Sequence, residues 1–123
     1  MRKVVVIVDD SDSVAAALAI ALETSLDVRA IVAHHPQAAL KIFETQSNIS
    51  AVVTDFSLPF LDGFELIKAL RKLHSYERLP ALMISAGEDP QSRNPSVECR
   101  PNVILRKPLS FKEVCRVVQS FLE

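Results

Sequence analysis

The sequence predicts an α/β fold in which five parallel strands form a doubly wound sheet with helices on both faces. Three observations support this prediction: five short apolar runs recur along the chain, segments of helical periodicity separate them, and each run is continuous rather than alternating. Continuous apolar runs are typical of parallel strands that are covered on both faces. Parallel strands that neighbour each other in a sheet need right-handed crossover connections, usually through a helix. The expected strands are residues 4–8, 28–32, 51–54, 81–84 and 103–105.

Composition indicates one domain and excludes several classes of function. The chain has 123 residues, of which 49% are hydrophobic, so we expect a single domain over residues 1–123. Its net charge of -1 argues against a general nucleic-acid or membrane-surface binder. With only 2 glycines, the chain has neither a Rossmann glycine motif nor a P-loop. Two cysteines without metal-binding spacing, and no apolar segment of signal-peptide length, predict a cytoplasmic protein.

The first expected helix has no charged residue between Val14 and Leu22. Its outer side is therefore apolar, like the side that packs on the sheet. One interpretation is that alanine is simply the best helix former, so that exposed alanines carry no function. The other is a docking face, because helices that are apolar all round are usually covered. The residues expected to face away from the sheet are Ala15, Ala16, Ala19 and Ile20.

Local signals mark the starts of three later helices. Pro36 suits the first position of the second helix, and His34 and His35 before it lack a third ligand at helical spacing. This favours a loop over a metal site. A capping box is expected where an N-cap residue precedes a glutamate by three positions. Asp62 with Glu65, and Ser110 with Glu113, have this spacing.

The fourth helix is the irregular part of the predicted fold. Between Gly87 and Asn102 lie prolines that include Pro90 and Pro95, and proline within a helix costs about 3 kcal/mol. We therefore expect this helix to be short, displaced or partly irregular. The last helix, in contrast, has apolar residues at the spacing of one helix face, so Cys115 is expected to be a buried hydrophobic residue.

Polar residues stand at the ends of four expected strands. In a parallel α/β sheet, ligands bind beyond the carboxyl ends of the strands, near the point where the strand order reverses. One acid after a strand is most often a helix cap, but three acids, a hydroxyl and a lysine at four strand ends favour a shared site. Asp9 and Asp10 follow the first strand, Asp55 the third, Ser85 the fourth and Lys107 the fifth.

The chemistry of these groups indicates phosphoryl transfer with a divalent cation. Three neighbouring carboxylates repel one another unless a positive charge lies among them, and Mg2+ takes such oxygen ligands while leaving positions for a phosphate oxygen. A carboxylate can attack phosphorus and form an acyl phosphate. The phosphoryl oxygens then need the metal, an ammonium group and a hydroxyl as partners. Asp55, Asp10, Lys107 and Ser85 supply this set.

Four ordered motifs contain these residues: V-V-V-I-V-D-D (4–10), T-D-F-S-L-P-F-L-D-G-F-E (54–65), L-M-I-S-A (82–86) and L-R-K-P-L (105–109). With them, the whole chain resembles a known family, the receiver domains of two-component response regulators. The resemblance implies a flavodoxin-like (βα)5 fold. It also implies a signalling domain that accepts a phosphoryl group, rather than an enzyme, beyond self-catalysed transfer and autodephosphorylation.

The resemblance further implies a metal site, with Mg2+ as the cofactor. Asp10 and Asp55 would bind Mg2+ directly, and Asp9 would bind it chiefly through a water molecule. The backbone carbonyl of Ser57 would be a further ligand.

The same resemblance implies how the phosphoryl group is received. Asp55 would be the phosphoacceptor, Lys107 would pair with the phosphoryl group, and Ser85 would move toward it as the switch hydroxyl. Pro108 would follow a cis peptide bond. The donor would be a histidine kinase or a histidine phosphotransfer protein that docks on the apolar first helix. Output would be contact with a downstream protein or a fused output domain, without nucleic-acid or membrane binding.

Two departures from the family pattern leave alternatives open. Ile104 stands where receivers commonly have Phe or Tyr, and prolines interrupt the fourth helix. A receiver-shaped binding module with weak or no phosphorylation-driven switching is therefore the first alternative. A hydrolase with an aspartyl-phosphate intermediate is the second. It needs a carboxylate near the nucleophile as general acid-base, but the residue two beyond Asp55 is only Ser57.

Overall fold

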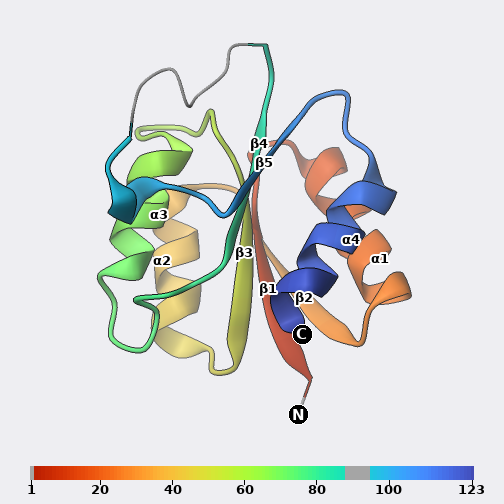
Figure 1. Ribbon diagram of the computed structural model, residues 1–123, viewed down its shortest axis with the longest axis horizontal. Coiled ribbons are helices and arrows are strands. Elements are labelled where there is room, and N and C mark those ends of the chain that lie inside the picture. Colours follow the sequence, from red (N-terminus) through yellow and green to blue (C-terminus); the bar gives the residue numbers. More distant parts are fainter. Residues whose placement is uncertain (1, 88–94) are drawn as a thin grey trace.

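The computed structural model describes residues 2–87 and 95–123, and its core is one parallel sheet (Figure 1). Within these residues the sheet has 5 strands in the order β2-β1-β3-β4-β5, and every neighbouring pair is parallel. This confirms the predicted doubly wound sheet. Each strand is one to three residues longer than expected. The strands are β1 (Lys3–Val8), β2 (Val28–Ala33), β3 (Ile49–Asp55), β4 (Ala81–Ser85) and β5 (Val103–Arg106).

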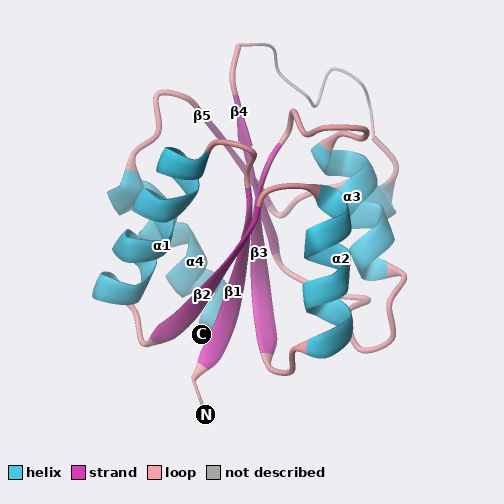
Figure 2. Ribbon diagram, turned by 180° about the vertical axis from the view of Figure 1, so that it is seen from behind, coloured by secondary structure: helices cyan, strands magenta, loops and turns pink. Residues whose placement is uncertain are grey.

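Helices cover both faces of the sheet, as predicted. Figure 1 shows α2 and α3 on one side of the sheet and α1 and α4 on the other, and Figure 2 shows the same layers from behind. Both faces of β1 are buried, because Val6 packs with one layer and Ile7 with the other. No helix in residues 2–87 and 95–123 is long and apolar enough to cross a membrane. The α-helices are α1 (Asp12–Ser25), α2 (Pro36–Thr45), α3 (Gly63–Arg71) and α4 (Phe111–Leu122).

Helix α1 corrects one detail of the predicted apolar outer side. Ala15 is 0% exposed and packs in the core with Leu18 and Leu22, so the expectation that Ala15 faces away from the sheet is wrong. The physical reason is spacing: Ala15 lies about one turn before Leu18 and two turns before Leu22, on one helix face. The rest of the predicted outer side comprises the exposed Ala16 and Ile20 and the half-buried Ala19.

Helix α2 begins where proline predicts. Pro36 is its first residue, and His35 is the N-cap, whose Nδ1 accepts a hydrogen bond from the N–H of Ala38 at 3.2 Å. His35 therefore acts as a helix cap, in agreement with the predicted loop at this point.

Helices α3 and α4 also start at the predicted caps. Asp62 accepts the N–H of Glu65 at 2.9 Å, and Glu65 accepts the N–H of Asp62 at 3.1 Å, which completes the predicted capping box of α3. Ser110 caps α4 by accepting the N–H of Glu113 at 3.2 Å, which is the first of the two bonds of the predicted box. Cys115 is buried, as expected.

The described part of the crossover from β4 to β5 is irregular, as the prolines predict. Among its described residues, the helical structure is a single 3-10 turn, η2 (Val97–Cys99), which packs beside α3 (Figure 1). Pro90 lies outside the described residues, whereas Pro95 lies two residues before η2. The described residues of this crossover therefore contain a short turn in place of a regular α-helix.

Arg71, the last residue of α3, holds this crossover in place. Its Nη2 donates to the carbonyl of Leu79 at 3.0 Å and to Oδ1 of Asn102 at 3.1 Å. Its Nη1 donates to the carbonyl of Arg100. The planar guanidinium thus joins α3 both to the residue Leu79 before β4 and to the end of the crossover before β5.

Candidate functional site

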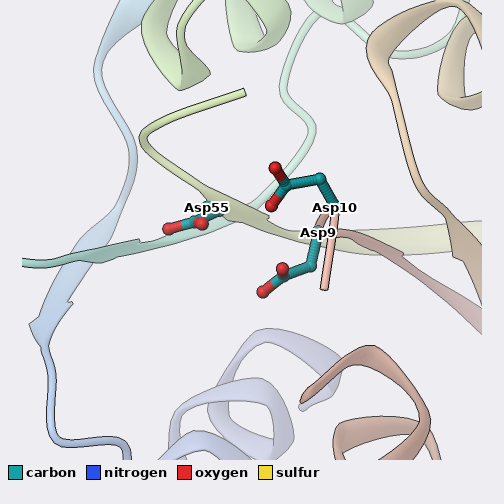
Figure 3. A group of neighbouring side chains, drawn as sticks. All are labelled: Asp9, Asp10 and Asp55. Atoms are coloured by element: carbon teal, nitrogen blue, oxygen red, sulfur yellow. The ribbon is translucent and has the colours of Figure 1, made fainter. Parts of the chain in front are cut away.

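The three acids predicted to share a site lie together. β1 has β2 on one side and β3 on the other, so the strand order reverses at this point, where ligands collect in such sheets. Asp9 and Asp10 directly follow β1, and Asp55 ends β3. Each offers a carboxylate oxygen, and these oxygens lie within 4.8 Å of one another (Figure 3). A carboxylate cluster therefore occupies the switch point of the sheet.

The two aspartates that follow β1 differ in exposure. Asp9 is only 3% exposed, whereas Asp10 is exposed. Oδ1 of Asp9 accepts a hydrogen bond from the N–H of Ser11 at 2.8 Å, and Ser11 is the N-cap of α1. The start of α1 therefore fixes the carboxylate of Asp9, while Asp10 lies on the solvent-exposed side of the cluster.

The pKa of Asp55 is raised above its ordinary value. Burial is the largest cause, since Asp55 is 8% exposed, and the neighbouring Asp9 and Asp10 carboxylates raise the pKa further. The Lys107 ammonium and the N–H of Phe56 lower it, but they do not outweigh burial and repulsion. A cation among the three carboxylates would offset both the burial of the charged Asp55 and its repulsion by Asp9 and Asp10.

Lys107 and Ser85 also lie at this edge of the sheet, as predicted. Nζ of Lys107 is 3.7 Å from Oδ2 of Asp55, and the lysine side chain is 38% exposed. The N–H of Lys107 donates to the carbonyl of Ser85 at 2.9 Å, which joins the ends of β5 and β4. Ser85 is buried and follows Ile84, the register partner of Asp55. The peptide bond before Pro108 is cis, as expected.

The loop after Asp55 is closed by backbone hydrogen bonds. The N–H of Phe56 donates to the carbonyl of Ile84 at 2.8 Å, and the carbonyl of Phe56 accepts the N–H of Gly63 at 2.7 Å. Ser57, whose carbonyl is an expected metal ligand, lies exposed in this loop. The loop is thus anchored to β4 at its start and to α3 at its end.

Phe60 forms the tip of the same loop in an unusual conformation. Its φ is 75°, and the N–H of Leu61 donates to the carbonyl of Pro59 at 2.9 Å. These features define a γ-turn with positive φ, which is rare and strained for a bulky residue. The Phe60 side chain is 93% exposed, so little packing compensates for the backbone strain.

The donor set at the cluster fits Mg2+. All three groups are carboxylates, the hard oxygen ligands that this ion prefers. Their oxygens span at most 4.8 Å, slightly more than the roughly 4.2 Å between opposite ligands of an octahedral Mg2+. A small closure of the side chains would therefore suffice for this cluster to hold one Mg2+ ion.

Comparison with known families places this geometry in context. The family model described as response regulator receiver domain matches residues 5–119, which include the carboxylate cluster and Lys107. The chain belongs to the response regulator receiver domain family. This agrees with the resemblance found in the four sequence motifs. A receiver domain is typically a signalling module rather than an enzyme.

Relatives in sequence support the assignment. An uncharacterized 14.6 kDa protein of Leptolyngbya boryana is 34% identical over 119 residues, which are 95% of this receiver and 88% of that protein. The alkaline phosphatase synthesis transcriptional regulatory protein PhoP of Bacillus subtilis is 34% identical over 123 residues, 99% of this receiver but 49% of PhoP. The receiver thus spans about half the length of that regulator.

Solved structures show the same fold. The receiver domain of the Francisella response regulator 1452 has a TM-score of 0.82 at 26% identity and covers 98% of this receiver and 96% of that chain. The chemotaxis response regulator CheY4 of Vibrio cholerae has a TM-score of 0.86 at 22% identity, with coverage of 98% and 99%. Both confirm the predicted flavodoxin-like arrangement.

Two further residues support the receiver site, although the sequence analysis assigned neither of them to it. Oγ1 of the buried Thr54 donates to the carbonyl of Asp55 at 2.9 Å. Nδ1 of His34 lies 3.1 Å from the carbonyl oxygen of Asp9, and its Nε2 lies 3.4 Å from Oδ1 of Asp12. Threonine is common in strands and gives no signal. His34 follows β2, the neighbour of β1, so the strand order could have indicated its proximity to Asp9.

Proposed function

We propose that this receiver, residues 1–123, accepts a phosphoryl group on Asp55 from a phosphohistidine and that the reaction needs Mg2+. Phosphorylation would then change the contacts of the receiver with other proteins. The observation that carries this proposal is the meeting of three carboxylates within 4.8 Å, with the Lys107 ammonium 3.7 Å from the acceptor. This set matches the needs of phosphoryl transfer to a carboxylate, namely a nucleophile, a cation site and a counter-charge.

Asp55 supplies the nucleophile in this proposal. One of its carboxylate oxygens forms a bond to phosphorus while the bond from phosphorus to the histidine nitrogen breaks, and the nitrogen keeps the electron pair. The products are an acyl phosphate on Asp55 and an unphosphorylated histidine. Water would then hydrolyse the acyl phosphate, which releases inorganic phosphate and returns Asp55 to the free carboxylate.

Asp9, Asp10 and the carbonyl of Ser57 would hold the metal together with Asp55. Asp10 would be a direct ligand and Asp9 a ligand chiefly through water. When bound, Mg2+ supplies positive charge where the phosphoryl oxygens become more negative. The burial and repulsion that raise the pKa of Asp55 are the costs that such a cation offsets.

Lys107 and Ser85 would receive the other phosphoryl oxygens. Nζ of Lys107 lies beside Oδ2 of Asp55 and could pass to a phosphoryl oxygen with a small side-chain rotation. Ser85, at the end of β4, would donate its hydroxyl to a further oxygen. This movement is the proposed link between phosphorylation and a change of the contact surface.

The proposed donor is a histidine kinase or a histidine phosphotransfer protein that docks on α1. Ile20 on the outer side of this helix is 66% exposed, and Ala16 lies exposed one turn earlier. α1 starts two residues after Asp10, so a partner bound along it is close to the acceptor. Ile20→Ala should slow transfer from a phosphorylated phosphotransfer protein, and an unchanged rate and affinity would contradict this docking site. A downstream protein or a fused output domain would read the phosphorylated state.

A receiver-shaped binding module that does not switch is a second candidate, and two observations favour it. Ile104 is half-buried in β5 at the position where receivers commonly carry an aromatic ring. Ile104 has no aromatic ring and no polar group, so it cannot rotate inward together with the Ser85 hydroxyl as such a ring would. The described part of the β4 to β5 crossover also holds only the 3-10 turn η2.

One spectroscopic experiment tests the proposal and separates the two candidates. Amide spectra of the chain are recorded with Mg2+ and either beryllofluoride or phosphoramidate, and Asp55→Asn serves as the control. An adduct whose shifts extend beyond Ser85 and Lys107 supports a switch. An adduct whose shifts stop at the site supports the module. If the wild-type chain forms no adduct, phosphoryl acceptance at Asp55 is wrong.

A further inference from the structure

A second surface of this receiver is a groove between α3 and η2, with a volume of about 490 Å3. Arg78 lines it and lies just before β4 begins at Ala81, at the amino end of that strand. The carboxylate cluster lies at the opposite, carboxyl ends of the strands. The groove is therefore separate from the phosphoryl site.

Cationic side chains dominate the walls of this groove. Lys68 lies in the last turn of α3, and Lys72, four residues later, is the C-cap residue of that helix. Like charges at this spacing are unfavourable by about 0.2–0.5 kcal/mol. Arg71 and Arg78 line the same groove. Within residues 2–87 and 95–123, no carboxylate forms an ion pair with Lys68, Lys72 or Arg78. Among the described residues, these three cations therefore lie together without a salt bridge to a carboxylate.

The two acids of the groove leave it positive. Glu77 accepts a hydrogen bond from a backbone N–H in its own loop at 3.3 Å. Glu98 is exposed, and its pKa is lowered chiefly by a hydrogen bond from Ser96 and also by the charges of Lys68 and Lys72. The field of these lysines therefore reaches a carboxylate on the opposite wall. Four cations and two acids leave a charge of +2 in a chain whose total is -1.

Arg71 adds a half-buried charge at the inner side of the groove. Its hydrogen-bond partners are neutral: the carbonyls of Leu79, Glu98 and Arg100 and the amide oxygen of Asn102. Burial lowers the pKa of its guanidinium, which means that partial loss of water makes the charged form less favourable. A carboxylate brought into the groove would offset part of that cost.

We propose that this groove binds an acidic amphipathic helix of a partner protein, with two carboxylates one turn apart on Lys68 and Lys72 and an apolar side chain on Val97. The spacing of the two lysines along α3 matches carboxylates at positions i and i+4 of a second helix. Val97 is 75% exposed on the wall formed by η2 and offers the apolar contact. This binding goes beyond the proposed phosphoryl transfer and does not depend on it.

Nucleic acid fits the groove less well than an acidic helix. Duplex DNA carries one charge per roughly 1.7 Å of its axis and needs a long basic surface. Here the cations are confined to one hollow, and Glu77 and Glu98 lie among them. The exposed Val97 also suits an apolar side chain better than a phosphate. A compact partner with both acidic and apolar groups therefore matches the groove best.

A synthetic helical peptide with glutamates four residues apart beside leucines provides the test. It is titrated at low salt into the isotope-labelled, unphosphorylated full chain, and amide shifts are followed. We expect shifts at Lys68, Lys72 and Val97, and about tenfold weaker binding for the double variant Lys68→Glu/Lys72→Glu. Lys41→Glu, at an exposed lysine on α2, should leave the affinity unchanged. Val97→Ser keeps all the lysines and should also weaken binding.

Several results would overturn this proposal. One is a lack of shifts at about millimolar peptide, the range of the weakest specific complexes. Others are equal binding of a peptide with glutamines in place of the glutamates, shifts outside the groove, or unchanged affinity for the double variant and Val97→Ser. A DNA duplex that binds the same lysines more tightly than the peptide would assign the groove to nucleic acid instead. Because Asp55 stays unphosphorylated throughout, failure here leaves the proposed phosphoryl transfer untouched.

Discussion

Gly63 lies so close to Asp55 that a Cβ atom on Gly63 would come within 2.8 Å of the Asp55 carbonyl oxygen. The same Cβ atom would lie 2.8 Å from Cε of Met83. The end of the Met83 side chain can move, but the backbone of Asp55 is held in β3. Gly63 also donates its N–H to the carbonyl of Phe56 at 2.7 Å. The first residue of α3 therefore packs directly against the backbone of the proposed phosphoacceptor.

Gly63→Ala is expected to destabilise the protein by roughly 1–3 kcal/mol, because the added methyl group overpacks this contact. Urea denaturation measures the change, and amide shifts at Asp55 and Phe56 should accompany it. Gly87→Ala is the control: no described residue lies within 4 Å of its Cβ position, so its expected cost of about 1 kcal/mol comes from the φ of 73°. Wild-type stability of Gly63→Ala would contradict the close approach.

Arg71→Ala is expected to lower the free energy of unfolding by roughly 1.5–3 kcal/mol, since a charged donor to several oxygens is lost. The carbonyls of Leu79 and Arg100 and the amide of Asn102 lose their shared partner. Arg71→Lys should recover only part of the loss, because an ammonium group cannot reproduce the planar fork.

Hydrogen exchange locates the effect of removing Arg71. The amides of Cys99 and Arg100, which bond within η2, should lose protection in Arg71→Ala. Arg78→Ala is the matched control, because Arg78 lines the same groove but makes no hydrogen bond to the described residues of the crossover, 86–87 and 95–102. If both variants lose equal stability, the guanidinium contacts do not hold the crossover.

Phe60→Asn is expected to raise the free energy of unfolding by about 0.5–1 kcal/mol. Asparagine tolerates positive φ, whereas phenylalanine at 75° is strained, and a ring that is 93% exposed loses little packing on removal. Phe60→Gly should give a smaller gain, because glycine also adds entropy to the unfolded chain. Thermal and urea unfolding provide the measurement. A loss of more than about 1 kcal/mol in both variants would show that the ring packs against the loop.

The sheet and the acidic site could be predicted from sequence for related physical reasons. Strands covered on both faces read as continuous apolar runs, and β1 has this character from Val4 to Val8. Where these runs stop, polar side chains meet at one edge of the sheet. Asp9, Asp55 and Lys107 were therefore predictable as neighbours, even though they lie far apart along the chain.

Other features could not be predicted because the sequence lacks the signal that would mark them. Residues 14–22 contain no polar side chain to show which face of α1 is outward, so the burial of Ala15 was missed. The positive φ of Phe60 lies at a residue type that gives no turn signal, unlike glycine or asparagine. The prolines predicted an irregular crossover, but the role of Arg71 in holding it depends on contacts between distant segments.

Ionisation of Asp55 is expected to reduce stability as the pH rises. Its pKa in the folded protein is raised by burial and by the neighbouring carboxylates, so the folded state holds this proton more tightly than the unfolded chain does. The protonated group contributes its full stability below the unfolded pKa of about 3.9, and this contribution is lost as the pH rises through the folded pKa. One proton gives a slope of at most about 1.4 kcal/mol per pH unit.

Asp55→Asn removes this titration and should become progressively more stable than the wild type as the pH rises from about 4, with a plateau above the folded pKa. Urea denaturation across this range without divalent cations measures the difference. Asp27→Asn, at an exposed aspartate outside the cluster, reports the general effect of the substitution. Added Mg2+ should shrink the advantage of Asp55→Asn at neutral pH, because the wild type binds the ion with a complete ligand set and gains stability from it. A difference that stays constant with pH would show that burial and repulsion do not act on Asp55 as the geometry of the cluster requires.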